Sequence, residues 1–307
     1  KVGACGRAPS CGKGLVSVRL SVQGGPGSGL GESAARASAP VPGHEPGPGK
    51  RGIQTPRRHG QTITDNAAVD EYAGFADIYE EWSAPMTDDV AFYVELAREA
   101  DGPVVELAVG TGRVAVPVAQ AIGRPVIGVD TSPAMLTKAR EAAGKAGVEL
   151  DLREGDMREL SLEEPAALVY CPYRSLLHLP SWAERRGLFE RVSSSLKPGG
   201  RFAWNAFVFN HASASEIDGR ARRHLGSDHI WELIEHTPAD SRIDITVFVG
   251  RPGDEPRSIT LWWTTKSEWE GLLDVSGLET EALYGWFDRR PFDDESKEFV
   301  WVARKPG

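Results

Sequence analysis

The chain has 307 residues, 40% of them hydrophobic and 26% charged, a composition typical of a globular protein of one large or two small domains. Residues 1–60 hold nine Lys/Arg against two acidic residues, about +7, so the net charge of −9 leaves about −16 on the remainder. An acidic body repels phosphate backbones and argues against nucleic acid as a partner. No stretch approaches the ~20 apolar residues of a membrane helix, so we expect no membrane association.

Residues 1–60 are rich in Gly and Pro and poor in large apolar side chains, so we expect a disordered extension before a single domain of residues 61–307. Its basic composition fits a transit peptide, but a linker or an extension without function is the favoured interpretation. Cys5, Cys11 and Cys171 form no even framework, which indicates a reducing, cytoplasmic setting without a structural disulfide. No second Cys/His pair follows Cys11 at zinc spacing, so no metal is expected.

Residues 61–307 alternate helix and strand patterns, which predicts an α/β domain with a largely parallel sheet. Aromatic residues spaced by 3, 4 and 3 predict a helix over residues 70–82, and a second helix follows with Thr87 as its N-cap. Five strands are expected at 104–109, 125–130, 148–156, 166–172 and 201–207. The helices between them are expected at 113–122, 132–147 and 181–200.

The pattern changes after the fifth strand. Three β-like runs at 229–237, 241–250 and 257–265 follow one another without a helix, which predicts an antiparallel meander. We assign it to an insertion of residues 207–264 on the substrate side. A helix at 266–277 and two strands at 278–287 and 298–304 complete the domain.

The stretch "VVELAVGTGR", residues 104–113, is an apolar run that ends in a glycine-rich turn. A phosphate loop would need G-x-x-x-x-G-K-[ST], which is missing near Gly110, and this argues against a nucleoside triphosphatase. Gly110 to Ala115 does satisfy G-x-G-x-x-[GA], and Asp130 follows 18 residues after Gly112. An NAD-dependent oxidoreductase is therefore one interpretation.

Glu106 decides between ligands, because a dinucleotide has no use for a carboxylate just before the turn. A ligand with a primary ammonium does, since an ionised carboxylate facing it forms a charge-assisted hydrogen bond. S-adenosylmethionine is such a ligand. The alternative is that Glu106 pairs with a basic residue on a neighbouring element, because a buried acid needs a partner.

Four motifs in order resemble those of the class I S-adenosylmethionine-dependent methyltransferases. They are Glu106-x-Ala108-x-Gly110-x-Gly112, the acid Asp130 after the second strand, "EGDM" at 154–157 and "LKPGGRF" at 196–202. The resemblance runs from about Tyr72 to Arg304. It implies a Rossmann-like, doubly wound sheet, mostly parallel with an antiparallel last strand, plus the antiparallel meander inserted after the fifth strand. The family usually has Gly where this chain has Ala108, which puts the path of the loop in question.

The resemblance also implies a site for S-adenosyl-L-methionine at the carboxyl ends of the parallel strands. Asp130 would take both ribose hydroxyls, and Asp156 the adenine amino group with Met157 beside the ring; a turn-forming Gly-Asp pair is the alternative for Asp156. Tyr79 either belongs to the core or covers the cofactor from an N-terminal helix. The expected cofactor-binding residues are Tyr79, Glu106, Ala108, Gly110, Gly112, Asp130, Asp156 and Met157.

The implied reaction is an in-line displacement at a sulfonium methyl group, for which the protein positions the acceptor and excludes water. A base matters only where the acceptor must lose a proton. The loop "CPYRSLLHL" after the fourth strand supplies Tyr173, Arg174 and His178 as acceptor-side candidates. His178 is either a general base or a surface histidine whose hydrogen bonds are satisfied. Asn205 and His211 are further polar candidates near the acceptor.

The meander resembles the extra antiparallel layer of small-molecule methyltransferases, such as those acting on sugar amines. Together with the acidic body it favours a small-molecule acceptor, methylated on N or O. An NAD-dependent oxidoreductase and a non-catalytic S-adenosylmethionine-binding sensor are the alternatives. The identity of the acceptor and the oligomeric state stay open.

Overall fold

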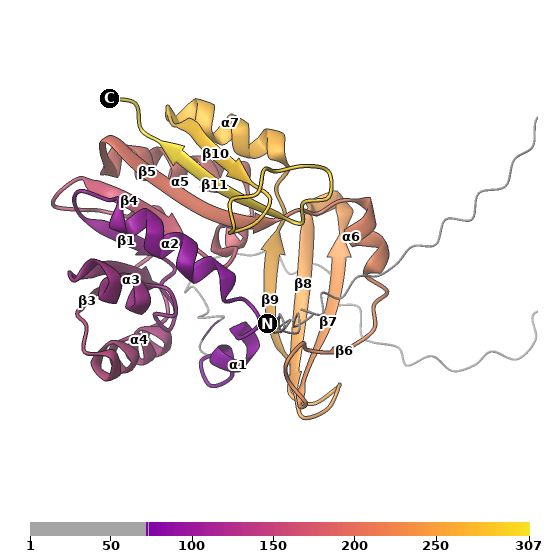
Figure 1. Ribbon diagram of the computed structural model, residues 1–307. Coiled ribbons are helices and arrows are strands. Elements are labelled where there is room, and N and C mark those ends of the chain that lie inside the picture. Colours follow the sequence, from indigo (N-terminus) through magenta and orange to yellow (C-terminus); the bar gives the residue numbers. More distant parts are fainter. Residues whose placement is uncertain (1–71, 73) are drawn as a thin grey trace, which may run out of the picture. The chain divides into compact units, whose positions relative to one another are not determined.

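The computed structural model describes Tyr72 and residues 74–307 (Figure 1). The expected extension of residues 1–60, with Cys5 and Cys11, lies outside the described residues. Seven strands form the central sheet in the order β10-β11-β5-β4-β1-β2-β3. They are β1 (Val104–Leu107), β2 (Val126–Asp130), β3 (Leu150–Glu154), β4 (Ala166–Cys171), β5 (Leu196–Phe207), β10 (Glu279–Tyr284) and β11 (Glu298–Arg304).

Strands β1 to β5 pair in parallel, and β11 lies antiparallel between β5 and β10. The chain moves outward from β1 through β2 to β3, and then returns to the other side of β1 for β4 and β5. The order therefore reverses between β1 and β4. Open α/β sheets bind ligands at the carboxyl ends of the strands at such a point.

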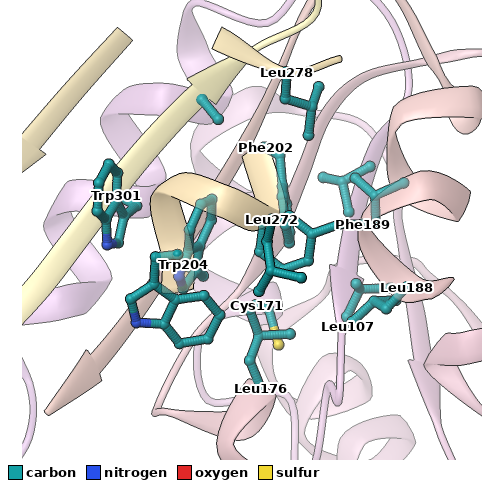
Figure 2. Packing of buried hydrophobic residues seen from close by; sticks show 14 of the residues in the cluster. Leu107, Cys171, Leu176, Leu188, Phe189, Phe202, Trp204, Leu272, Leu278 and Trp301 are labelled. Atoms are coloured by element: carbon teal, nitrogen blue, oxygen red, sulfur yellow. The ribbon is translucent and has the colours of Figure 1, made fainter. Parts of the chain in front are cut away.

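Helices cover both faces of this sheet, because alternate residues of its strands are buried on opposite sides. One face packs on α2 (Asp88–Arg98), α3 (Ala115–Ile122) and α4 (Pro133–Ala146). The other packs on α5 (Trp182–Ser195) and α7 (Lys266–Ser276). Figure 2 shows this second cluster, with Phe189 of α5 and Leu272 of α7 against Trp204 of β5. The doubly wound, mostly parallel fold with an antiparallel last strand is confirmed.

The expected meander is a separate antiparallel sheet in the order β6-β7-β8-β9. Helix α6 (His211–Glu216) precedes it, and its strands are β6 (Arg222–Arg223), β7 (Ile230–Thr237), β8 (Arg242–Val249) and β9 (Arg257–Trp262). One face of this sheet packs in a third buried cluster, in which Ile230 and Val247 lie with Trp82 and with Met135 of α4. The second sheet thus packs on α1 (Tyr79–Ser83), the short helix seen near β8 and β9 in Figure 1.

The helix expected over residues 70–82 is wrong in extent, because among the described residues of that range only those from Tyr79 onward, in α1, are helical. Tyr72 and residues 74–78 form turns, in which the N–H groups of Phe75 and Ala76 both donate to the carbonyl of Tyr72. The aromatic spacing reflects ring packing instead, since the Phe75 and Trp82 rings lie 5.5 Å apart. Thr87 occupies the N-cap of α2 but makes no side-chain cap bond. Three short 3₁₀ helices complete the elements: η1 (Met157–Glu159), η2 (Ser175–His178) and η3 (Pro238–Asp240).

Candidate functional site

The glycine-rich loop after β1 alternates into the left-handed region at three positions. Ala108, Gly110 and Gly112 have φ values of 53°, 54° and 80°. A Cβ atom at Gly112 would lie 3.4 Å from the side chains of Ala139 and Val116, so the loop packs closely on α4 and α3. Glycine adopts such angles without steric cost, whereas a residue with a Cβ is strained by about 1–2 kcal/mol. The loop accepts alanine at position 108, but under strain.

Asp130, at the end of β2, is held against this loop. Its Oδ2 accepts the N–H of Gly110 at 2.8 Å, and its Oδ1 accepts the N–H of Ser132 at 2.9 Å. Ser132 in turn caps α4, as expected, by accepting the N–H of Met135. The carboxylate therefore has a fixed orientation beside Gly110. Its role toward a ribose stays a prediction.

Glu106 is the buried acid of β1, with 1% of its surface exposed. Tyr170 of the adjacent strand β4 lies opposite Glu106, and its hydroxyl donates to Oε2 at 2.7 Å. Burial raises the pKa of Glu106 to about 8, although this hydrogen bond and the charge of Arg113 act in the opposite direction. Arg113 itself forms a bidentate pair with the buried Asp89 at 2.8 and 2.6 Å. Among the described residues no cation pairs with Glu106, so the ion-pair alternative finds no support there.

A buried polar chain continues from Tyr170 along the same face of the sheet. The Tyr170 ring stacks on Tyr93 at 5.1 Å, and the Tyr93 hydroxyl donates to Asn205 Oδ1 at 3.1 Å. Asn205 Nδ2 donates to Glu298 Oε1 at 2.6 Å, and Arg174 Nη2 donates to Glu298 Oε2 at 2.8 Å. Burial raises the pKa of both tyrosines, so they remain hydrogen-bond donors. Arg174 therefore binds the fully buried Glu298 of β11, and Asn205 bridges that pair to Tyr93.

The loop after β4 is strained, because Tyr173 and Arg174 are successive non-glycine residues with φ of 55° and 66°. The ion pair to Glu298 holds this backbone in place. The Tyr173 ring lies 5.1 Å from the Arg113 guanidinium carbon and 6.1 Å from the Tyr79 ring. Tyr173 thus sits between the glycine loop and α1. Strained non-glycine residues of this kind gather at functional sites.

Tyr79 of α1 lies against the glycine loop. A Cβ built on Gly110 would be 3.9 Å from Tyr79 Cε1 and 4.0 Å from its hydroxyl oxygen. Burial raises the pKa of Tyr79 further above its usual range, so the phenol stays neutral. The ring also contacts Tyr72 and Trp82, at 6.1 and 6.2 Å. The side chain therefore packs in an aromatic cluster and also lies on the loop, and its contact with the cofactor stays a prediction.

Asp156 follows β3 and forms the turn proposed as its alternative role. Its Oδ1 accepts the N–H of Arg158 at 2.8 Å, and the Arg158 guanidinium binds both carboxylate oxygens. Burial raises the pKa of Asp156, but the bonds and charge of Arg158 outweigh it, so the pKa lies below its usual value. Met157 packs at the edge of the cluster that contains α5. The contact of both residues with adenine stays a prediction.

His178 is partly buried and its ring is hydrogen-bonded, as the second of the two interpretations from the sequence expected. Its Nε2 lies 2.8 Å from the hydroxyl of Tyr72, and the two rings pack edge to face at 5.4 Å. Burial lowers the pKa of His178 to about 4, so the ring is neutral at pH 7 and a weak base. His211, by contrast, is exposed in the first turn of α6.

The second sheet contributes polar groups that the sequence did not single out. Trp82 Nε1 donates to Oε1 of Glu232 on β7, and His224 Nδ1 lies 3.1 Å from the same oxygen. The Trp82 ring is 6.3 Å from Tyr173. In "HIWELIEHT" the acid looks like an ordinary solvent-facing position of an alternating strand. The one available signal was that Glu232 shares its face with Ile230 and Ile234.

The described residues offer no metal cluster, no membrane-spanning helix and no reactive thiol. Within residues 74–307 and Tyr72, no group of three or more His, Cys, Asp or Glu side chains is placed to hold a metal ion. None of the helices described is long and apolar enough to cross a bilayer. Cys171 is a free, buried cysteine, and burial raises the pKa of its thiol. It therefore remains a protonated core side chain.

Comparison with known proteins identifies the arrangement. A family model described as "Methyltransferase domain" matches residues 104–200, from β1 into β5. The solved structure of the CcbJ methyltransferase from Streptomyces caelestis superposes with a TM-score of 0.67 at 28% identity, over 76% of this chain and 96% of that one. These matches confirm the resemblance to the class I S-adenosylmethionine-dependent methyltransferases.

Relatives agree with this assignment. The cypemycin N-terminal methyltransferase of a Streptomyces species is 23% identical over 252 residues, 80% of this chain and 98% of that protein. A carboxy-S-adenosyl-L-methionine synthase of Escherichia coli is 33% identical over 95 residues, 30% of this chain and 37% of that protein. This methyltransferase is thus an enzyme whose cofactor is S-adenosyl-L-methionine. The NAD-dependent oxidoreductase alternative, which depended on the glycine spacing, is wrong.

The chemistry of the site fits that cofactor. Glu106 is a buried carboxyl group bound by a neutral hydroxyl, and its pKa of about 8 keeps it mostly protonated at neutral pH. An ammonium group would supply the cation that favours its ionised form. The left-handed turns at Gly110 and Gly112 let a ligand approach the backbone closely. The switch between β1 and β4 and the fixed carboxylate of Asp130 lie at the same edge of the sheet.

Proposed function

We propose that this methyltransferase methylates an amine nitrogen of a small molecule. The observation that supports this most is an acidic side chain next to aromatic rings. Glu232 contacts Trp82 and His224, and Trp82 packs on Tyr173. A protonated amine is attracted by both the carboxylate and the ring faces, whereas a hydroxyl gains only a hydrogen bond. The N-terminal amine methylation named for the cypemycin relative supports the same choice.

The cofactor would be held at the carboxyl edge of the central sheet. Glu106 would face its ammonium, Asp130 its ribose and Asp156 its adenine, with Met157 beside the ring and Tyr79 above the glycine loop. Bound S-adenosylmethionine supplies a methyl group on a good leaving group. The remaining work for the chain is to orient the acceptor and to exclude water. The rings of Tyr79, Trp82 and Tyr173 suit the second task, because they pack against one another beside the loop.

Charge supports a small acceptor. With residues 1–60 near +7, the rest of the chain is near −16, which disfavours nucleic acid and attracts small cations. The second sheet places its Glu232 next to the ring cluster and would form a wall of the acceptor site. The cytoplasmic setting expected from the cysteines stays a prediction.

Matched pairs of acceptors test the proposal. The full chain is incubated with methyl-labelled S-adenosylmethionine and either an aminosugar or its hydroxyl analogue, and either a dipeptide or its N-acetylated form. We expect label in the free amines only, and much less of it with Glu232→Gln. Glu235→Gln, an exposed acid on the opposite face of β7, is the matched control and should behave as the wild type. Label confined to hydroxyl acceptors would contradict the amine assignment.

A further inference from the structure

Glu232 occupies an unusual position on β7. Side chains alternate along a strand, so Glu232 shares its face with Ile230 and Ile234. Ile230 belongs to the buried cluster that contains Trp82 of α1. A carboxylate on an apolar face needs hydrogen-bond donors. At Oε1 it accepts the indole N–H of Trp82, and Nδ1 of His224 lies 3.1 Å from the same oxygen.

The close approach of Nδ1 to the Glu232 carboxylate orients the imidazole of His224. An ionised carboxylate only accepts hydrogen bonds, so Nδ1 must carry the proton that faces Glu232. A neutral ring then has its lone pair on Nε2. That atom is buried and forms no hydrogen bond with any described residue. A buried acceptor without a partner costs folding free energy, which a ligand with an N–H group would recover.

His224 lies at the edge of the aromatic cluster of the site. Its ring centroid is 6.4 Å from that of Trp82. The other ring neighbours of Trp82 include Tyr79 and Tyr173, at 6.2 and 6.3 Å, and both lie next to the glycine loop. A single indole therefore separates the imidazole from residues of the candidate cofactor site.

We propose that His224, oriented by Glu232, accepts the proton of the acceptor amine; this rests on the proposed function. A protonated amine has no lone pair, so its N–H proton must first move to Nε2. The resulting imidazolium faces the Glu232 carboxylate, which stabilises its charge. The freed nitrogen pair then forms the N–C bond while the C–S bond of S-adenosylmethionine breaks, and its electrons remain on the sulfur of the departing S-adenosylhomocysteine.

The surroundings favour His224 over His178 for this step. His178 is bonded to the Tyr72 hydroxyl, and within the described part of the chain no carboxylate is among its hydrogen-bond partners. The charged groups nearest His224 in the chain are Arg222 and Arg223 of β6. Arg222 pairs with Asp218, and Arg223 packs on the Trp231 ring. Tyr173 is the titratable group on the loop side, and burial, together with the charge of Glu232, raises the pKa of its hydroxyl. Glu232 is thus the acid paired with the ring.

The orientation can be tested without any acceptor. Nitrogen-15 spectra of the imidazole groups in the full chain, assigned by loss of a signal in His224→Asn, report which ring nitrogen holds the proton. We expect the Nδ1–H tautomer in the wild type, and a mixture of tautomers in Glu232→Gln. A dominant Nε2–H tautomer in the wild type would overturn the proposal.

The catalytic step is tested with the amine that the wild type methylates best. Asn at position 224 keeps a donor for Glu232 but offers no base, so kcat/KM should fall by about 10²–10⁴-fold. The loss should shrink as the pH rises, because the amine then deprotonates in solution. His229→Asn is the matched control, since His229 also contacts a carboxylate, Asp228, but is exposed, and it should match the wild type.

The outcomes separate the two proposals. A loss in His224→Asn that is equal at every pH would show a structural role and overturn the assignment of a base. Failure of the wild type to methylate any amine would instead overturn the proposed function, and the tautomer of His224 would still show whether the Glu232 pair exists.

Discussion

Replacing Glu106 by Gln should raise the stability of the fold and at the same time lower its affinity for the cofactor. In the folded protein burial raises the pKa of Glu106 from 4.5 to about 8. Between these values the folded state holds a proton that the unfolded state has released, so stability falls as the pH rises toward 8. The loss is about 1.4 kcal/mol per pH unit. Gln does not titrate, and its amide oxygen can still accept the Tyr170 hydroxyl.

The magnitude follows from this slope. Between about pH 6 and pH 7.5, the unfolding free energy of Glu106→Gln should gain about 2 kcal/mol relative to the wild type. The other titrating groups are the same in both proteins, so their contributions to the pH dependence of the unfolding free energy cancel in the difference. Urea unfolding of both proteins at the two pH values measures the difference. An unchanged difference would show that Glu106 is already ionised in the folded state, and that the account of its burial is wrong.

Cofactor binding gives the second half of the same experiment. At pH 7 a group with a pKa of about 8 is about nine-tenths protonated. If Glu106 must ionise to face the ammonium of S-adenosylhomocysteine, binding should release nearly one proton. Calorimetric titration in buffers of different ionisation enthalpy measures that proton. The Gln variant should release none and bind about tenfold to a hundredfold more weakly, since a hydrogen bond to a charged group contributes about 1.5–3 kcal/mol. Equal proton release in both proteins would refute the pairing.

Four further outcomes are expected. Ala108→Gly should raise the unfolding free energy by about 1 kcal/mol in urea, because glycine relieves the strain of the left-handed backbone; a loss would mean that the strain is absent. Asp130→Ala should lower the affinity for S-adenosylhomocysteine about tenfold to a few hundredfold, measured by calorimetry, and Asp130→Asn should lower it less. Equal affinities in all three proteins would show that Asp130 does not bind the ribose. Glu298→Gln should lower the unfolding free energy by about 2 kcal/mol, since Arg174 loses its anion; an unchanged value would make the pair dispensable. Deleting residues 1–60 should leave the melting temperature and cofactor affinity unchanged, and a large drop in either would show that they pack on the domain.

Local patterns carried much of the fold. The strand, turn and helix that surround Gly110 lie within one short stretch, so apolar runs and turn residues were enough to place them. The buried acid of β1 was equally visible, because a charge inside an apolar strand needs a reason. The meander followed from three β-like runs without an intervening helix.

Long-range pairs could not be predicted in the same way. Tyr170 donates to Glu106 across 64 residues, and Trp82 donates to Glu232 across 150. Such contacts depend on strand register and on the packing of the second sheet, which residue spacing does not encode. Glu298 was missed for the same reason, because it follows the charged run of residues 293–297 and reads as part of a polar loop before the apolar strand. The prediction of a long helix over residues 70–82 was wrong because the aromatic spacing reflects ring packing rather than helical backbone hydrogen bonds.

A crystal structure with S-adenosylhomocysteine tests the central claim most directly, namely that the cofactor lies at the carboxyl edge of β1 and β2 with its sulfur facing the aromatic cluster. The account predicts the amino group against Glu106, the ribose hydroxyls on Asp130, and the sulfur turned toward Tyr79 and Tyr173. A ligand whose amino group lies away from Glu106, or whose sulfur faces away from these rings, would contradict it.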